Sequence, residues 1–325
     1  MMTKSEHFYA KILLFGEYGV ILGSQALSIP YTHFAGELSF ITDDKYTDYN
    51  AALNSNENLK GFAAYLRNKR DLMSLTKTDI IRMEKELADG LYFESSIPQG
   101  YGVGSSGALV AAFYARYAGA RVKASASISQ KDILNLKSIF SEMESFFHGK
   151  SSGIDPLNAY LQYPLHMKGR TDITLVGIPR HKFEEDGAIF LIDTGSAGKT
   201  DTGVTRFLNL CENSDYINHM QQEYLPLINS AISTLIGGRH QEFFRATAAL
   251  SAFQLNHFHE MIPEAFIPAW KQGLETGDYH LKLCGSGGGG FILGFTQSLT
   301  QTRLALKDYY TQLVPVYRHT EHSNG

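Results

Sequence analysis

Hydrophobic and polar positions along the chain alternate in ways that predict both strands and helices. Residues 8–23 and 34–42 are rich in aromatic and β-branched side chains, which is typical of strands, and 8–23 would fold back on itself around the turn at 16–19. The polar run 45–58 predicts a loop. Further strand-like segments lie at 91–98, 188–195, 281–295 (a strand or a turn) and 313–318.

Apolar residues at helical spacing, or long apolar segments rich in alanine, predict the helices. They lie at 61–70, 77–90, 106–121, 130–147, 214–236, 239–257, 263–275 and 298–312. The glycines and serines of 148–163 predict a turn, and the mixed segment 164–187 is the expected domain boundary. We therefore expect an α+β fold with domains at 1–180 and 181–325, because strands and helices alternate irregularly over a length suited to two domains.

Composition narrows the class of protein. Hydrophobic residues make up 43% of the 325 residues and charged residues 19%, enough to bury a substantial core. The formal net charge of −4 gives no electrostatic reason to expect nucleic-acid binding. Two cysteines, Cys211 and Cys284, are too few for a disulfide framework, which favours the cytoplasm. The start lacks the apolar core of a signal peptide, and the absence of 18 consecutive apolar residues predicts no membrane span.

The segment PQGYGVGSSGAL at 98–109 is the first candidate site. Its glycines allow a backbone with positive φ to approach an anion, and the apolar helix expected after it would offer unpaired N–H groups to a phosphate. Ser105 and Ser106 add hydroxyls, one for phosphate and one for Mg²⁺. An ordinary glycine loop with a serine helix cap is the alternative that the residues alone leave open.

Two further segments carry glycine. LKLCGSGGGGFILGF at 281–295 has four consecutive glycines, which indicates close approach to a ligand or to another segment, or else a tight structural turn. DTGSAGKT at 193–200 ends like a Walker A loop, but Asp193 stands where that motif needs glycine. The residues at 201–204 also predict no clean helix start, so we do not interpret this segment as a P-loop.

Charged residues near these loops suggest phosphoryl-transfer chemistry. EMESFFHGKSSGID at 142–155 contains Glu144 and Asp155, one able to bind Mg²⁺ and the other able to orient or deprotonate a hydroxyl. Surface charge beside a turn is the alternative. Lys11 lies inside an apolar strand-like run, where a lysine is costly unless it is paired, and Asp155 is its expected partner. The alternative interpretation is that Lys11 lies at the edge of a strand and reaches solvent.

Taken together, these segments resemble the GHMP kinase superfamily, and within it the mevalonate kinases. The resemblance rests on AKILLFGEYGVILGSQAL at 10–27, PQGYGVGSSGAL at 98–109 and KLCGSGGGG at 282–290, in that order, with HGKSSGID at 148–155. It implies a ribosomal-protein-S5-like N-terminal domain, a ferredoxin-like C-terminal domain and the ATP-dependent phosphorylation of mevalonate at its primary hydroxyl. ATP, Mg²⁺ and a small-molecule acceptor are the implied partners, and a homodimer is left open.

The resemblance also implies roles for individual residues. Asp155 would be the catalytic aspartate and Lys11 its cationic partner, while Ser106 and Glu144 would hold Mg²⁺. The residues implied to hold ATP are Gly100, Gly102, Val103, Gly104, Ser105, Ser106 and Gly107. The residues implied on the substrate side are Glu17, Tyr18, Lys199, Thr200 and Gly287.

Two positions differ from the mevalonate kinase pattern. Mevalonate kinases usually have Gly-Glu-His in the first motif, whereas this chain has Tyr18, as phosphomevalonate kinases often do. Gly198 stands where a basic residue is expected before Lys199. Phosphomevalonate kinase or another GHMP small-molecule kinase is therefore the alternative, although Asp155 argues against homoserine kinases. An inactive nucleotide-binding protein on the same fold is a hypothesis from a different class.

Overall fold

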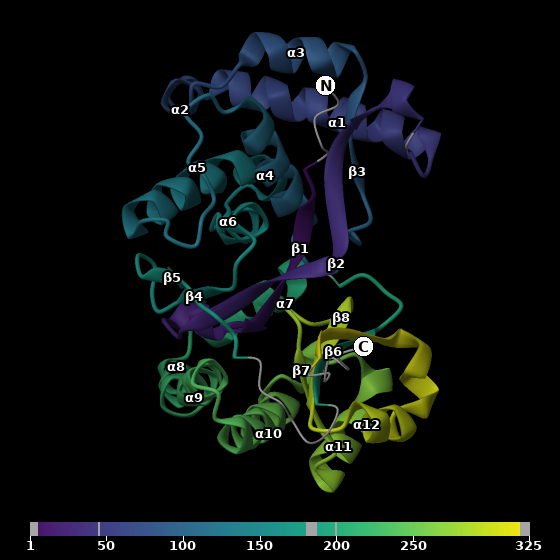
Figure 1. Ribbon diagram of the computed structural model, residues 1–325. Helices are drawn as coiled ribbons and strands as arrows, with labels where there is room; N and C mark the ends of the chain where they lie inside the picture. The colour runs from purple at the N-terminus through teal and green to yellow at the C-terminus, as the bar shows by residue number, and fades with distance from the viewer. Residues whose placement is uncertain (1–5, 45, 180–186, 199, 319–325) are drawn as a thin grey trace, which may run out of the picture. The chain divides into compact units, whose positions relative to one another are not determined.

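The computed structural model describes residues 6–44, 46–179, 187–198 and 200–318, with only the backbone described at 200–202 and 310–318 (Figure 1). The chain divides into two compact units. The first contains the residues up to 11, 29–98 and 103–163, and the second contains 12–28, 99–102 and the residues from 164 onward. The division into domains 1–180 and 181–325 stays a prediction.

The first unit combines helices with parts of two strands and the whole of a third. Its helices are α1 (Tyr49–Asn68), α2 (Arg70–Thr76), α3 (Ile80–Ala88), α4 (Ser105–Tyr117), α5 (Gln130–His148) and α6 (Ile154–Leu161). Strand β2 (Ala26–Phe40) pairs antiparallel with β3 (Leu91–Ser95) in the register Gly36↔Ser95. Strand β1 (Phe8–Phe15) begins in this unit and continues into the other.

Helix α1 shows that the prediction of a loop at 45–58 is wrong. Asp48 caps the helix by accepting a hydrogen bond from the Ala51 N–H at 2.8 Å. The polar composition hides a buried stripe at helical spacing, formed by Ala52, Asn56, Leu59, Phe62, Ala63 and Leu66. Asn56 is tolerated in this stripe because its amide nitrogen donates to the carbonyls of Leu87 at 3.0 Å and Leu91 at 2.6 Å. Tertiary burial therefore outweighs the weak helix propensity of the segment.

Helix α6 lies where the sequence predicted only a turn. Gly153 has φ 74° and serves as the helix N-cap, so the glycine and serine signal marks the start of a helix rather than a loop through to 163. The helix is short, and its residues from Pro156 to Leu161 are all buried. A buried run of six residues, most of them apolar, has no amphipathic periodicity, which is why the pattern did not indicate it.

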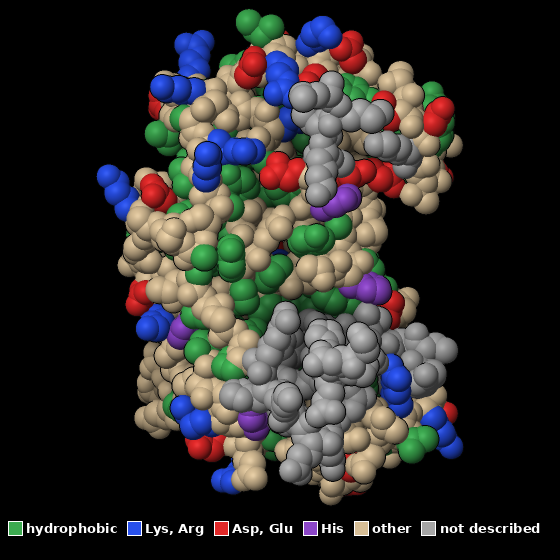
Figure 2. Space-filling view, viewed as in Figure 1, with side chains coloured by type: hydrophobic (Ala, Val, Ile, Leu, Met, Phe, Trp, Pro, Cys, Tyr) green, Lys and Arg blue, Asp and Glu red, His purple; other side chains and the backbone are tan. Residues whose placement is uncertain are grey.

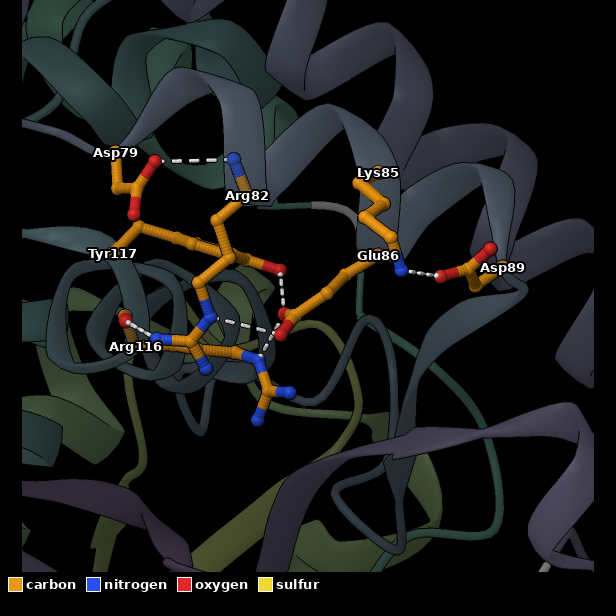
Figure 3. A network of polar contacts seen from close by, with 7 residues as sticks. All are labelled: Asp79, Arg82, Lys85, Glu86, Asp89, Arg116 and Tyr117. Atoms are coloured by element: carbon orange, nitrogen blue, oxygen red, sulfur yellow. Dashed lines mark hydrogen bonds and ion pairs between the residues drawn. The ribbon is translucent and has the colours of Figure 1, made fainter.

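A polar network joins α3 to the C-terminal end of α4 (Figure 3). Glu86 accepts hydrogen bonds from Arg82 Nε at 2.9 Å, Arg116 Nε at 2.6 Å and the Tyr117 hydroxyl at 2.8 Å. Burial alone would raise the pKa of Glu86, but these three donors outweigh burial and lower it. The network anchors the helix whose opposite end follows the glycine loop.

The second unit contains a four-stranded antiparallel sheet. Its strands are β6 (Ala188–Asp193), β7 (Tyr279–Leu283), β8 (Phe291–Thr296) and β9 (Leu313–Arg318), in the order β7-β8-β6-β9. Short strands β4 (Leu165–Met167) and β5 (Ile173–Leu175) extend the beginning of β2. Helices α10 (His240–His257) and α11 (Ile267–Thr276) pack on β7. The other α-helices are α7 (Thr200–Leu210), α8 (Ser214–His219), α9 (Leu225–Ile236) and α12 (Leu299–Ala305), and η3 (Met220–Tyr224) is a π-helix. Short 3₁₀ helices are η1 (Gly19–Leu22), η4 (His259–Met261), η5 (Glu264–Phe266) and η6 (Lys307–Gln312).

Two local predictions in this unit are corrected. The segment 8–23 is not a two-stranded hairpin, because β1 is followed by the 3₁₀ helix η1 and the second strand begins only at Ala26. A helix, α7, does begin at Thr200, contrary to the expectation that 201–204 start none. The P-loop reading still fails, since Asp193 ends strand β6 in place of the required glycine.

The surface shown in Figure 2 carries acidic and basic side chains interspersed among the described residues. That distribution agrees with a net charge of only −4 over the chain. None of the helices in the described part of the chain is long and apolar enough to cross a membrane.

Candidate active site

The glycine loop leads directly into helix α4. Gly100, Gly102 and Gly104 have φ of 76°, 70° and 81°, a left-handed conformation that favours glycine. Gly104 is the N-cap of α4 and provides no side-chain cap, so the first-turn N–H groups are available for an anion. The positive φ angles that the sequence predicted for this loop are therefore confirmed.

A cluster of oxygen atoms surrounds the start of α4. The Ser106 hydroxyl donates to Glu144 Oε1 at 3.0 Å, and the Ser151 hydroxyl donates to Glu144 Oε2. His148 Nε2 lies 3.0 Å from the Ser106 Oγ. Because Ser106 gives its single proton to Glu144, His148 donates to Ser106 through Nε2. Ser106 is thus held between a carboxylate and an imidazole.

Glu144 lies at the buried end of this cluster, with only 4% of its surface exposed. Burial, together with the negative charge of Asp155, raises its pKa from the ordinary value of 4.5 to about 7. Hydrogen bonds from Ser151 and Ser106 and the charge of Lys11 act in the opposite direction, but they do not overcome burial. The raised pKa of Glu144 therefore comes chiefly from its burial and secondarily from the charge of Asp155.

Lys11 and Asp155 form an ion pair in the first unit. The Lys11 Nζ lies 3.1 Å from Asp155 Oδ1, with 11% of the lysine side chain and 33% of the aspartate side chain exposed. The backbone N–H of Lys11 donates to the Val103 carbonyl at 2.9 Å, which joins β1 to the glycine loop. A Cβ built on Gly104 would lie 3.0 Å from Lys11 Cγ and 3.6 Å from Asp155 Oδ2. The pairing predicted from the sequence is confirmed, and it lies directly against the loop.

Two glycines allow the helices of the site to pack closely against one another. A Cβ on Gly107 in α4 would lie 2.7 Å from the backbone carbon of Asp155, and one on Gly153 would lie 2.2 Å from the Lys137 carbonyl of α5. Such distances are closer than real Cβ atoms reach. Gly107 therefore serves the packing of α4 against α6, and through that contact it sets the position of Asp155.

The donor set of this cluster fits Mg²⁺. Glu144, Ser106 and Asp155 offer the hard oxygen ligands that Mg²⁺ prefers, and a divalent cation beside Glu144 would favour the ionised carboxylate that burial and Asp155 disfavour. The described residues contain no group of three or more His, Cys, Asp and Glu side chains suited to a metal.

The second unit contains the other glycine-rich segments, and the φ angles at 285–290 explain why glycines follow one another there. Five glycines of the turn at 285–290 have positive φ, namely Gly285 (77°), Gly287 (72°), Gly288 (75°), Gly289 (149°) and Gly290 (70°). A Cβ on Gly289 would lie 2.9 Å from the Ala197 backbone, and one on Gly287 would lie 2.4 Å from the Met261 carbonyl. Close approach of other chain segments therefore requires glycine in this turn.

Backbone hydrogen bonds join this turn to two other loops of the same unit. The Thr194 N–H donates to the Gly290 carbonyl at 2.9 Å, and the Gly290 N–H donates to the Ser196 carbonyl at 2.6 Å. The Gly198 N–H donates to the Gly100 carbonyl at 3.1 Å. The segment at 193–198 thus lies between the glycine turn and residues 99–102, which are part of the glycine loop.

The residues predicted on the substrate side lie in different environments. The Glu17 carboxylate is paired with the Lys282 ammonium in the protein interior. Tyr18 is 4% exposed and donates its hydroxyl proton to the Ser286 carbonyl. Gly287 is buried in the glycine turn. Lys199 lies outside the described residues, as does the side chain of Thr200.

Comparison with known proteins finds a sequence similarity in part of the chain. Residues 60–162 match the sequence model described as "GHMP kinases N terminal domain". This part of the chain is similar to the N-terminal domain of GHMP kinases. It includes the glycine loop, Ser106, Glu144 and Asp155. No curated protein matches the chain by sequence.

Solved structures give the fold of the whole chain. Mevalonate kinase of L. major in complex with R-mevalonate matches with a TM-score of 0.62 at 16% identity, covering 97% of this chain and 95% of that one. Phosphomevalonate kinase of Streptococcus pneumoniae matches with 0.58 at 16%, covering 98% and 99%. Lactococcus lactis galactokinase complexed with galactose matches with 0.61 at 13%, covering 98% and 94%. The predicted GHMP kinase fold is confirmed, and identities this low establish the fold alone.

Several residues around these motifs make contacts that the sequence does not predict. Ser151, which binds the second oxygen of Glu144, lies inside the segment 148–155 but was given no role. Lys282 interrupts an apolar strand just as Lys11 does, so the same argument could have identified it. Tyr224, which donates its hydroxyl proton to the Glu17 carbonyl, and Gln254, which donates to the Tyr224 hydroxyl, carry no local sequence signal. Only these tertiary contacts distinguish them from ordinary helix residues.

Proposed function

We propose that this chain is an ATP-dependent small-molecule kinase that phosphorylates an alcohol, with the primary hydroxyl of mevalonate as the first candidate acceptor. The observation that carries the proposal is the Lys11–Asp155 ion pair beside the helix start that bears Ser106 and Glu144. A carboxylate, a cation and a phosphate-binding helix N-terminus in one place are the groups that phosphoryl transfer uses. The resemblance of PQGYGVGSSGAL and HGKSSGID to the motifs of mevalonate kinases supports the choice of acceptor.

Each residue then has a definite task. N–H groups at the start of α4, with the hydroxyl of Ser105, bind the phosphate oxygens of ATP. Asp155 accepts a hydrogen bond from the acceptor hydroxyl, orients it toward the γ-phosphate and takes its proton as the new O–P bond forms and ADP leaves. Lys11 balances the charge that develops near Asp155. The transition state of such transfers is loose, so positioning and charge neutralisation dominate over strong base catalysis.

Glu144 and Ser106 are the residues that would hold Mg²⁺. When bound, the ion supplies positive charge to the phosphate oxygens. In its absence Glu144 keeps a raised pKa of about 7.

Phosphomevalonate is the second candidate acceptor, and Tyr18 favours it. Phosphomevalonate kinases often carry tyrosine at this position of the first motif. The Streptococcus pneumoniae phosphomevalonate kinase shares the fold with a TM-score of 0.58, so the fold does not separate the two acceptors. The two candidates differ by one phosphate group, which an assay can discriminate directly.

A coupled ADP-release assay with mevalonate, phosphomevalonate, galactose and homoserine tests the proposal. We expect the highest kcat/KM with mevalonate. Activity with phosphomevalonate alone would reassign the acceptor. If no ADP is released with any of the four acceptors, the proposed function loses its support.

Asp155→Asn tests the catalytic role within the same assay. We expect kcat to fall by about 10²–10⁴-fold, the range that a positioned proton acceptor contributes, while the Kd of ATP changes little. Asp71→Asn is the matched control, because Asp71 is exposed at the start of α2 and its removal changes the net charge equally. A near-normal kcat for Asp155→Asn would contradict the role of this residue.

A further inference from the structure

The turn that follows β1 has an unusual backbone. Tyr18 has φ 57° and ψ −43°, a conformation that a bulky aromatic residue adopts rarely and at a cost in energy. Such strain persists only where the surrounding structure enforces it, and it concentrates at functional sites. The contacts of Glu17 and Tyr18 therefore indicate what holds this turn.

The first restraint is a buried ion pair. The Lys282 ammonium donates to Glu17 Oε1, with 2% of the lysine side chain and 1% of the glutamate side chain exposed. It also donates to the Leu283 carbonyl at 2.6 Å and lies 5.7 Å from the ring centroid of Phe15. Buried pairs stabilise a fold little more than apolar residues of the same size, so this pair matters chiefly through the geometry that it imposes.

The second restraint is a relay of two buried side chains. Tyr224 donates its hydroxyl proton to the backbone carbonyl of Glu17 at 3.0 Å. The amide nitrogen of Gln254 donates to the Tyr224 hydroxyl at 3.0 Å, and its oxygen accepts the Leu283 N–H at 2.8 Å. The relay thus begins at the backbone of Glu17 and ends beside Lys282, so the two restraints form one closed network.

Helix geometry brings Tyr224 into this relay. Residues Met220–Tyr224 form a π-helix between α8 and α9, and Tyr224 is its last residue. A π-helical turn inserts an extra residue, rotates the side chains that follow, and often occurs at functional sites. The irregularity therefore lies at the residue that contacts the first motif.

The third restraint joins the turn to the glycine-rich segment. The Tyr18 hydroxyl donates to the Ser286 carbonyl, one residue before Gly287. The Tyr18 ring packs against the rings of Phe207 and Phe258, with centroid distances of 4.8 Å and 5.3 Å. The hydroxyl and ring of Tyr18 are thus committed to contacts within the protein.

We propose that Glu17, Lys282, Tyr224 and Gln254 form a positioning network that holds the Tyr18 turn against the glycine turn at 285–290. Glu17 acts through Lys282 and does not contact the acceptor, in contrast to the substrate-side role that the family resemblance implied. The same turn fixes the C-terminal end of β1, the strand that carries Lys11. The inference rests on the proposed kinase function for its catalytic consequence.

Glu17→Leu combined with Lys282→Met separates positioning from stability. Each single variant leaves one buried charge without its partner and should lower the melting temperature. The double variant replaces the pair with apolar groups and should restore the melting temperature of the wild type. We expect the double variant to lose at least tenfold in kcat while the KM for the acceptor stays within about threefold, since loss of an interaction realised only in the transition state lowers kcat. A normal kcat with a KM raised tenfold would identify Glu17 as a substrate contact and overturn the proposal.

Tyr224→Phe is the milder test, because it removes one hydroxyl and keeps the ring. The matched control is Tyr279→Phe, another fully buried tyrosine of the second unit, whose hydroxyl donates to the Ala269 carbonyl at 2.7 Å. We expect Tyr224→Phe to lower kcat about threefold to tenfold and the control to leave it unchanged. Equal kcat values for the two variants would contradict a positioning role.

Amide hydrogen exchange tests whether the network holds the turn, and it does not depend on a measurement of enzymatic activity. The N–H groups of Val20 and Ile21 donate to Gly16 and Tyr18 carbonyls at 3.0 Å, so their exchange reports on the turn. Tyr224→Phe should speed exchange in a peptide covering 16–24 at least tenfold, and Tyr279→Phe should not. Unchanged exchange in Tyr224→Phe would refute the network, whereas a wild-type protein inactive with every acceptor would refute only the proposed function.

Discussion

Replacing Gly107 with alanine tests how the packing of α4 against α6 sets the position of Asp155. The added Cβ would lie 2.7 Å from the backbone carbon of Asp155, 2.8 Å from Pro156 N and 2.9 Å from Asp155 Cβ. Ordinary contact begins at 3.4 Å, so the two helices must separate by about 0.7 Å at this point. Two of the three atoms belong to the backbone, so a change of rotamer cannot relieve the clash.

That displacement acts on the ion pair. The Lys11 Nζ to Asp155 Oδ1 distance is 3.1 Å, so an outward shift of this size removes the contact from hydrogen-bond range. A misplacement of about 1 Å at a reacting group costs about 10²-fold in rate, so we expect kcat to fall between about tenfold and a hundredfold. Overpacking costs about 1–3 kcal/mol, and the higher helix propensity of alanine offsets about 1 kcal/mol of it, which leaves a net loss of about 0–2 kcal/mol.

The assay is steady-state ADP release together with urea denaturation of the same samples. Gly61→Ala is the matched control, because Gly61 lies in α1 and its added Cβ would meet only the Phe146 ring, at an ordinary distance of 3.6 Å. The control should gain about 0.5–1 kcal/mol of stability and keep its kcat. If Gly107→Ala turns over like the wild type, the argument that this glycine positions Asp155 is wrong.

Two further predictions concern pH. The pKa of Glu144 rises from 4.5 to about 7 on folding, so the folded state binds the proton more tightly, and the free energy of unfolding should fall by about 2–3 kcal/mol as the pH rises from 4.5 to 7. Denaturation in EDTA should show this fall in the wild type and not in Glu144→Gln, and a parallel pair of curves would contradict it. Glu86 has a lowered pKa in the folded state, so its ionised carboxylate stabilises the fold at a pH above its pKa in the unfolded chain. That stabilisation is lost as the pH falls through the pKa of Glu86 in the folded protein. At pH 7, Glu86→Gln should therefore cost about 1–2 kcal/mol after allowance for solvent screening, with kcat unchanged, and a loss of activity at full stability would refute the structural role of this network.

Sequence reasoning worked best where the chemistry conflicts with the local pattern. A lysine in an apolar strand and an aspartate after a glycine turn are both costly unless they meet, and Lys11 and Asp155 do meet at 3.1 Å. It failed where a mostly polar segment contains a buried stripe, as in α1, and where most of a short helix is buried, as in α6. In both cases the solvent exposure of each residue, which no local pattern contains, decides the structure.

The α+β class, the order of the three glycine-rich motifs and the residue types of the candidate site can all be predicted from the sequence, because backbone freedom, charge and apolar spacing are local properties. The contacts that those residues make depend on the folded chain. It joins Ser151 and His148 to the Ser106–Glu144 cluster, and it pairs Glu17 with Lys282, 265 residues away in the chain. It also shows that the glycine run avoids the backbone of Ala197 and the carbonyl of Met261. Such long-range contacts depend on how packed segments meet, and a linear pattern does not record that.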